Sequence, residues 1–319
     1  MDTKRFLLHS LFGTTTAVLI FLISLMVPVV GVVLSLLTPL PIMVLSRLWG
    51  LGAGILSVLI GTSILAIALG PGPGIIFFAE FGLLAILLYH YLVRKHLPWD
   101  RAIALSSLFV LVAATFLVIL YGLVASVNPI EWVRGEIQET GRSILQIYPL
   151  ENGENQSLLA ISEKLTEFIL RILPSLLILT MWLEGMVNTF LFTRIMAVSA
   201  SGRYRMTMTP AFSTWTCPDS FVWGGILGGF LIITKVPSLA TVGINTVILL
   251  IAIYFLQGLA IVSFFFKKNN VPLGLRVIGY IMIGIFQFLF FLVAALGLFD
   301  MWVNFRKLRP KVTAYEKDS

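Results

Sequence analysis

Two carboxylates within long apolar stretches are the residues whose type and position best suit chemistry. Glu80 lies in the stretch 75–93, and Glu184 lies in the stretch 168–192. A charged side chain inside the hydrocarbon of a membrane costs about 2.5 kcal/mol or more, so such a residue is by default a candidate for a ligand site or a proton relay. Two alternatives are open: Glu80 lies near the membrane surface, or Glu184 pairs with Arg171.

Asn188 follows Glu184 by four residues, a spacing that puts both side chains on one face of a helix. We therefore expect a ligand-binding site inside the membrane that contains Glu184, Asn188 and Glu80. Later apolar stretches contain uncharged polar residues that either line a cavity or join helices by hydrogen bonds worth about 0.6 kcal/mol each. We favour the second interpretation. These residues are Asn245, Gln257 and Gln287.

Small residues recur at intervals of four in two of the apolar stretches. Such spacing lets the backbones of neighbouring helices approach closely. The resulting faces pack either within the chain or against a partner chain, and the sequence leaves both open. The residues are Gly50, Gly54, Ser57, Gly61, Gly224 and Gly228.

The spaced motifs that mark metal, nucleotide or hydrolytic sites are missing from the sequence. The single cysteine, Cys217, cannot form an internal disulfide, and no spacing of Cys and His resembles a zinc or iron–sulfur site. The turn 70–74 lacks the lysine and hydroxyl residue of a Walker motif, and no HExxH or GxSxG motif is present. We therefore predict a protein that is not an enzyme and has no metal, cofactor or catalytic residue.

The composition is that of a membrane protein. Of the 319 residues, 58% are hydrophobic and 12% are charged, against about 25% charged residues in soluble domains; the mean hydropathy is +0.99. Apolar runs of roughly 15 to 27 residues match the length that a helix needs to cross about 30 Å of hydrocarbon. The net charge of +7 comes largely from basic residues at the ends of these runs, so we expect a lipid bilayer and no nucleic acid as partner.

The sequence therefore predicts an all-α fold, a polytopic membrane bundle of eight or nine transmembrane helices. Residues 14–45 are expected to form two short helices, broken near Pro28 and Gly31. The glycine-rich run 221–234 is short for a crossing; it gives nine crossings if it spans and eight if it is re-entrant, and we favour eight. The other expected spans are 51–69, 75–93, 103–125, 168–192, 240–266 and 277–299.

Four parts follow one another along the chain. They are a five-helix membrane unit (1–126), an acidic extracytoplasmic segment (127–167), the C-terminal membrane helices (168–305) and a basic tail (306–319). Apolar residues recur at helical spacing in the acidic segment, which predicts an amphipathic helix that lies on the membrane face or caps the bundle. The positions of Lys and Arg between the spans place the N-terminus in the cytoplasm, within a bacterial inner membrane.

The chain resembles the YybS-like family of bacterial membrane proteins, whose function is not established. The resemblance rests on Tyr254–Ala260, Leu296–Trp302 and Phe305–Lys307 near the C-terminus. Near the N-terminus it rests on Pro39–Pro41, the glycine-spaced third helix, Gly70–Pro71 and Phe78–Gly82 ahead of Arg94–Lys95, so it extends over nearly the whole chain.

The N-terminal half is also similar, more weakly, to the substrate-binding S components of energy-coupling-factor transporters. That resemblance implies a six-helix bundle that docks on a transporter scaffold through small-residue faces. The C-terminal helices and the acidic segment depart from it, and no vitamin-binding residue of that family is carried over. Because no Walker motif is present, any pumping would need ATPase subunits from other chains.

The leading functional hypothesis is an integral inner-membrane protein that binds or transports a small molecule through Glu184, Asn188 and Glu80. Its protein partner would be a transporter scaffold or a second copy of the chain. One alternative is a structural or regulatory membrane protein that binds partner helices through the glycine faces. The other, which we favour least, is an intramembrane enzyme with residues scattered over several helices.

Overall fold

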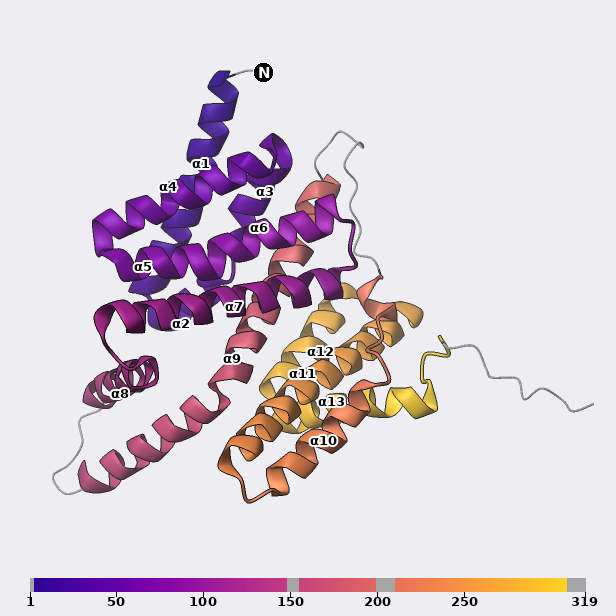
Figure 1. The fold of residues 1–319 in the computed structure, drawn as a ribbon. Helices are drawn as coiled ribbons and strands as arrows, with labels where there is room; N and C mark the ends of the chain where they lie inside the picture. Colours follow the sequence, from indigo (N-terminus) through magenta and orange to yellow (C-terminus); the bar gives the residue numbers. More distant parts are fainter. Residues whose placement is uncertain (1–2, 148–154, 199–209, 309–319) are drawn as a thin grey trace, which may run out of the picture. The chain divides into compact units, whose positions relative to one another are not determined.

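The computed structural model describes residues 3–147, 155–198 and 210–308, and these form helices throughout, with no strand in those ranges (Figure 1). The chain divides into two compact units, Met1–Met208 (unit 1) and Thr209–Ser319 (unit 2). The predicted all-α membrane bundle is confirmed. Several residues weighed in the sequence lie outside the described ranges, namely Tyr148, Glu151, Glu154, Arg203, Arg205, Arg309 and Lys311.

Unit 1 contains nine α-helical segments and two π-helical ones in its described part. They are α1 (Thr3–Met26), α2 (Pro28–Ser35), α3 (Pro39–Trp49), α4 (Leu51–Leu69), α5 (Pro71–Ile76), η1 (Phe77–Gly82), α6 (Leu83–Tyr89), η2 (His90–Arg94), α7 (Trp99–Ala125), α8 (Pro129–Ile147) and α9 (Asn155–Val198).

Prolines set the breaks at the start of unit 1. Pro28 and Pro39 occupy the first turns of α2 and α3, where the missing N–H of proline costs nothing and its fixed φ suits a helix start. The predicted break near Pro28 is confirmed. The first helix begins at Thr3 rather than at Thr14, because polar residues at a membrane surface do not end a helix.

The segment between Pro71 and Arg94 forms one membrane-spanning stretch with two π-helical turns in it. π turns are rare and occur mostly as single insertions in α-helices, frequently at functional sites. The first of them, η1, contains Glu80. Its neighbours pack tightly, since the ring of Phe21 from α1 lies 5.6 Å from Phe77 and 5.5 Å from Phe81, centroid to centroid.

The described parts of the acidic segment form the predicted amphipathic helix α8 and the start of α9. The amphipathic helix α8 packs against the first half of α9, and Arg134 of α8 lies 3.9 Å from Glu167 of α9. A boundary was predicted at residue 168, but the 44-residue helix α9 continues across this position without a break. Glu and Lys side chains are good helix formers, so a change from polar to apolar composition marks entry into the membrane without a break in the helix.

Unit 2 is built around one long helix. Its described elements are η3 (Phe212–Thr214), α10 (Phe221–Ile233), α11 (Pro237–Lys268), α12 (Leu273–Ile285) and α13 (Gln287–Val303). Both α10 and α13 pack against α11. The backbones of α11 and α13 meet at two glycines: a Cβ added at Gly258 would overlap the carbonyl oxygen of Val293, and one added at Gly297 would overlap that of Tyr254.

The expectation of one straight helix over residues 277–299 was wrong. The chain bends by 102° between α12 and α13, at Phe286, whose backbone is extended (φ −87°, ψ 106°). Gln287 alone interrupts the apolar run at this position, and a single uncharged polar residue does not predict a bend.

Seven helices of the described chain are long and apolar enough to cross a membrane, and the bent pair brings the number to eight if it forms one span. The favoured prediction of eight spans therefore equals the upper of these two numbers. The alternative of nine needed α10 as a crossing, but its 13 residues extend only about 20 Å. Large apolar side chains such as Phe12, Ile67 and Leu123 are exposed on the spans, as expected of surfaces that face lipid.

Candidate functional site

Glu184 lies in the apolar half of α9 with only 2% of its surface exposed. Its Oε1 atom is buried and has no hydrogen-bond partner among the described residues. The alternative that Glu184 pairs with Arg171 is not supported, because the described chain contains no ion pair to Glu184. Arg171 is 13 residues earlier in the same helix, roughly 20 Å away along its axis.

Asn188 is held one turn after Glu184 by both protons of its amide group. The Nδ2 atom donates to the backbone oxygen of Glu184 at 2.7 Å and to that of Leu36, in the connection between α2 and α3, at 2.6 Å. These bonds fix the orientation of the amide, since the opposite orientation would place Oδ1 against two carbonyl oxygens. Asn188 is 0% exposed, and its Oδ1 has no partner within the described ranges.

Glu80, in η1, belongs to the same unit as Glu184. The carboxyl groups of these two residues, far apart in the sequence, are within range of an electrostatic interaction. Glu80 lies about 14 Å along the helix from Pro71, close to the middle of a span that ends at Arg94. The alternative that Glu80 lies near the membrane surface is therefore not favoured. All three residues predicted for the ligand site lie in unit 1, and their role in binding a ligand stays a prediction.

Helix α7 covers the site from another side. A Cβ added at Gly185, next to Glu184, would lie 3.0 Å from the Cγ2 atom of Ile103, so α9 and α7 touch at this level. Ser106 and Ser107 follow Ile103 by three and four residues, which places them near the same face of α7. Both side chains are buried, and neither hydroxyl has a hydrogen-bond partner in the part of the chain that the structure describes.

The connection between α2 and α3 supplies a further wall. Leu36 accepts the bond from Asn188, and two residues later Thr38 is fully buried with a hydroxyl that has no partner among the residues described. Sequence reasoning missed Thr38 and the serines of α7. The available signal was that each is a hydroxyl residue within or next to an apolar stretch, but such residues usually bond their own helix backbone and rarely mark a site.

The geometry suits hydrogen bonding or proton exchange with a small polar ligand better than metal coordination. Within the described ranges no group of three His, Cys, Asp or Glu side chains comes together. The predictions that the protein holds no metal or cofactor and is not an enzyme stay predictions.

The small residues of α4 face other helices of unit 1. A Cβ at Gly54 would overlap the hydroxyl oxygen of Ser46 in α3, and one at Gly61 would lie 2.8 Å from Cε1 of Phe77. Ser57 accepts a hydrogen bond of 2.8 Å from Thr14 of α1. The last member, Gly50, lies at the junction of α3 and α4 with φ +92° and has no atom within 4 Å of an added Cβ.

In unit 2 the small residues of α10 face α11. A Cβ at Gly228 would lie 3.1 Å from Val247 Cγ2 and 3.3 Å from the carbonyl oxygen of Gly243, and one at Gly224 would lie 3.5 Å from Leu250 Cδ1. Most of the predicted faces thus have neighbours within their own unit. Their proposed second role, as an interface for a partner chain, stays a prediction.

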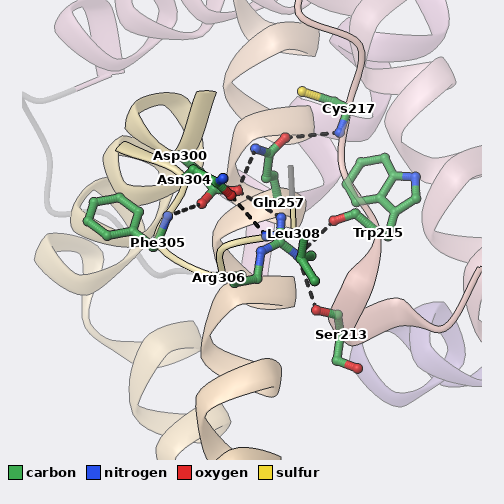
Figure 2. Close-up of polar contacts among 9 residues, drawn as sticks. All are labelled: Ser213, Trp215, Cys217, Gln257, Asp300, Asn304, Phe305, Arg306 and Leu308. Atoms are coloured by element: carbon green, nitrogen blue, oxygen red, sulfur yellow. Dashed lines mark hydrogen bonds and ion pairs between the residues drawn. The ribbon is translucent and has the colours of Figure 1, made fainter. Parts of the chain in front are cut away.

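A second buried polar cluster, in unit 2, was not anticipated from the sequence (Figure 2). Arg306 donates to Asp300 Oδ2 at 2.8 Å and, through NH1, to the backbone oxygens of Ser213 at 3.1 Å and Trp215 at 2.9 Å. Gln257 of α11 accepts from the backbone N–H of Cys217 at 3.0 Å and donates to Asp300 Oδ2 at 3.3 Å.

Arg306 is the first residue of the basic tail predicted from the sequence, and the structure shows that its side chain is buried, with 4% of its surface exposed. The chain turns at Asn304, whose φ is +50°, and this turn brings Arg306 back over the last residues of α13. Asp300 Oδ1 also accepts from the backbone N–H of Phe305 at 2.9 Å. Gln257 joins elements, as the favoured interpretation of the later polar residues expected. The hydrogen bonds of this cluster join η3 and the segment after it to α11 and to the end of α13.

A family model described as a predicted membrane protein (DUF2232) matches residues 15–301. The chain belongs to the DUF2232 family. No curated protein and no solved structure matches it.

The DUF2232 match extends over most of both units and ends before Arg306, and its description agrees with the helical spans of the structure. It establishes a membrane protein and names no activity or ligand. The narrower YybS-like name and the likeness to S components gain no support from the comparisons. The functional argument therefore depends on the geometry of the buried polar residues.

Proposed function

We propose that this DUF2232 protein is a non-enzymatic component of the bacterial inner membrane that binds a small polar molecule for transport. The binding site is the cluster of Glu184, Asn188 and Glu80 in unit 1, and the N-terminus is cytoplasmic. Because the sequence has no Walker motif, energy for transport would come from ion gradients or from ATPase subunits of other chains.

The observation that carries the proposal is the buried, unpaired carboxylate of Glu184. A buried charge is strongly unfavourable unless it is paired or hydrogen-bonded, yet Oε1 of Glu184 has no such partner in the described chain. The second carboxylate nearby, Glu80, adds to the unfavourable charge. A ligand or a proton that enters the site would provide the missing compensation, and intramembrane carboxylates of this kind commonly mark substrate or ion pathways.

A likeness of the N-terminal half to S components would fit this role, because such proteins bind a solute and dock on a separate scaffold. In that case the acceptor for the bound molecule is a second membrane protein. The glycines of α4 and α10 are largely in contact within their own units, so this docking would use other apolar surfaces of the spans.

The test is solute binding by the full-length protein in lipid nanodiscs. Native mass spectrometry identifies molecules that co-purify, and thermal unfolding against a metabolite panel measures stabilisation, which is about 2.7 kcal/mol at a ligand concentration 100 times the dissociation constant. Glu184→Gln should abolish the mass-spectrometric signal and the stabilisation. Glu163→Gln, an exposed glutamate of the same helix, is the matched control. Absence of any bound solute in the wild-type protein would contradict the proposal.

A further inference from the structure

Among the unpaired atoms of the candidate site, those of Glu184 and Asn188 are oxygens that accept hydrogen bonds, and the hydroxyls of Thr38, Ser106 and Ser107 can donate as well as accept. Asn188 uses both amide protons on the backbone oxygens of Leu36 and Glu184, so the atom it leaves free is the oxygen Oδ1. The amide lies over the preceding turn, because it bonds the carbonyl of Glu184 four residues earlier. The free oxygen therefore lies on the side of the helix that carries the Glu184 carboxylate. An ionised carboxylate is also an acceptor only.

Both carboxylates lack a cationic neighbour. No Lys, Arg or His side chain lies within 4.0 Å of Glu80 or Glu184 in the described chain. The basic residue of α3, Arg47, lies nine residues beyond Thr38, about 14 Å along the helix. On α9, Arg194 is six residues past Asn188 and is exposed. The site thus has two carboxyl groups without a basic partner in the described chain, together with the free amide oxygen of Asn188, in a region of low dielectric.

The side chains of the site are buried, so only a small ligand is expected to bind there. Glu184 and Asn188 are almost fully buried, and Gly185 between them is in contact with Ile103 of α7. The two carboxylates and the amide oxygen of Asn188 make three acceptor groups. A primary ammonium group has three N–H donors, which equals the number of these acceptor groups.

On these grounds we propose that the site binds a small ammonium-type cation, either ammonium itself or a short primary amine in its protonated form. Its N–H groups donate to the carboxylates of Glu184 and Glu80 and to Oδ1 of Asn188, and its positive charge offsets the negative charge of the carboxylates. The inference rests on the proposed function and specifies the class of molecule that the site takes.

The test compares four monovalent cations that differ in donor capacity, with magnesium as a divalent comparison. Thermal unfolding of the full-length protein in nanodiscs is followed with ammonium, methylammonium, tetramethylammonium, sodium and magnesium chlorides at constant pH and ionic strength. Ammonium or methylammonium should raise the midpoint in a saturable way. Tetramethylammonium should not, because it has the charge and no N–H donor. The stronger of the first two effects identifies ammonium or a primary amine as the preferred ligand.

Variants place the effect at the site. Asn188→Leu should weaken methylammonium binding about tenfold, because it removes one acceptor of a hydrogen bond to a charged donor. Glu184→Gln should abolish the effect, and Glu163→Gln should leave it unchanged. If Glu184→Gln fails to fold, Glu80→Gln takes its place, with loss of at least the same tenfold expected.

Three results would overturn the inference. These are stabilisation by sodium or magnesium without an effect of the two N–H donors, an equal effect of all five salts, and a methylammonium effect that survives in Asn188→Leu, Glu184→Gln and Glu80→Gln. If native mass spectrometry finds another bound solute while the ammonium cations have no effect, the inference fails and the proposed function stands. If no solute binds at all, both fail.

Discussion

The two units differ in whether their buried carboxylates have a cationic partner. In unit 2 the carboxylate of Asp300 meets the guanidinium of Arg306 at 2.8 Å, and Gln257 and backbone groups complete the cluster (Figure 2). In unit 1 the carboxyl groups of Glu80 and Glu184 have no cationic partner in the described chain. The comparison separates a buried polar cluster that holds helices together from one that is incomplete until something binds.

The difference has a direct consequence for mutational experiments. Where charges are paired, removal of one partner leaves the other buried and uncompensated, and stability falls. Where a carboxylate has no partner, its removal costs little stability and affects binding instead. Residues that support function at the expense of stability are expected at such sites.

The largest effect is expected for Asp300→Ala. It leaves the guanidinium of Arg306 buried without its counter-charge, so the free energy of unfolding should fall by about 3–5 kcal/mol. Denaturant titration of the full-length protein in mixed micelles measures the change. Asp219→Ala, at an exposed aspartate of the same unit, is the matched control. A loss no greater than that of the control would show that the unit 2 cluster is not structural.

The next effect concerns the close approach of α11 and α13 beside this cluster. In Gly297→Ala the new Cβ would overlap the backbone oxygen of Tyr254, so the helices must separate, with an expected loss of up to about 3 kcal/mol. Gly229→Ala, where an added Cβ meets no atom within 4 Å, should be nearly neutral. Equal midpoints for the two alanine variants in the same titration would contradict this account of the packing.

A smaller loss is expected for Gln257→Leu. The substitution leaves the backbone N–H of Cys217 without its acceptor and keeps the ion pair between Asp300 and Arg306, so we expect about 1–2 kcal/mol. Hydrogen exchange of the Cys217 amide, read by mass spectrometry, should become faster. Unchanged exchange there would indicate that Gln257 does not hold this segment.

The smallest effect on stability is expected for Glu184→Gln. This variant is also the most direct test of the comparison between the two clusters. No hydrogen bond to Oε1 is lost, and the new amide brings two donors to a cluster rich in acceptors. The free energy of unfolding without ligand should stay within about 0.5 kcal/mol of the wild-type value or increase. A loss comparable to that of Asp300→Ala would mean that Glu184 is a structural residue with a partner, and the two clusters would then be alike.

Local patterns in the sequence predict the elements well. Apolar runs locate the spans, prolines locate the break at Pro28, and helical periodicity identifies α8. The placement of Glu184 and Asn188 on one face follows from their spacing alone, because both lie on the same helix. Each of these features depends on residues close together in the chain.

Features that join distant segments could not be predicted in this way. The proximity of Glu80 to Glu184 depends on how two helices pack, and neither helix encodes its neighbour. The return of Arg306 to Asp300 depends on the left-handed conformation of Asn304, which few residues adopt and which no composition reveals. The bend at Phe286 likewise occurs within an apolar run that only Gln287 interrupts.

The π turn that contains Glu80 changes the direction in which side chains point along its span. One residue inserted into a helix with 3.6 residues per turn rotates everything after it by about 100° relative to a regular continuation. The segment that follows η1 therefore presents a different set of residues to α3 and α7 than a helical wheel drawn through residues 71–94 would indicate. Deletion of a single residue from η1 would keep the span apolar. It would also change the direction in which Glu80 points relative to the residues that follow it.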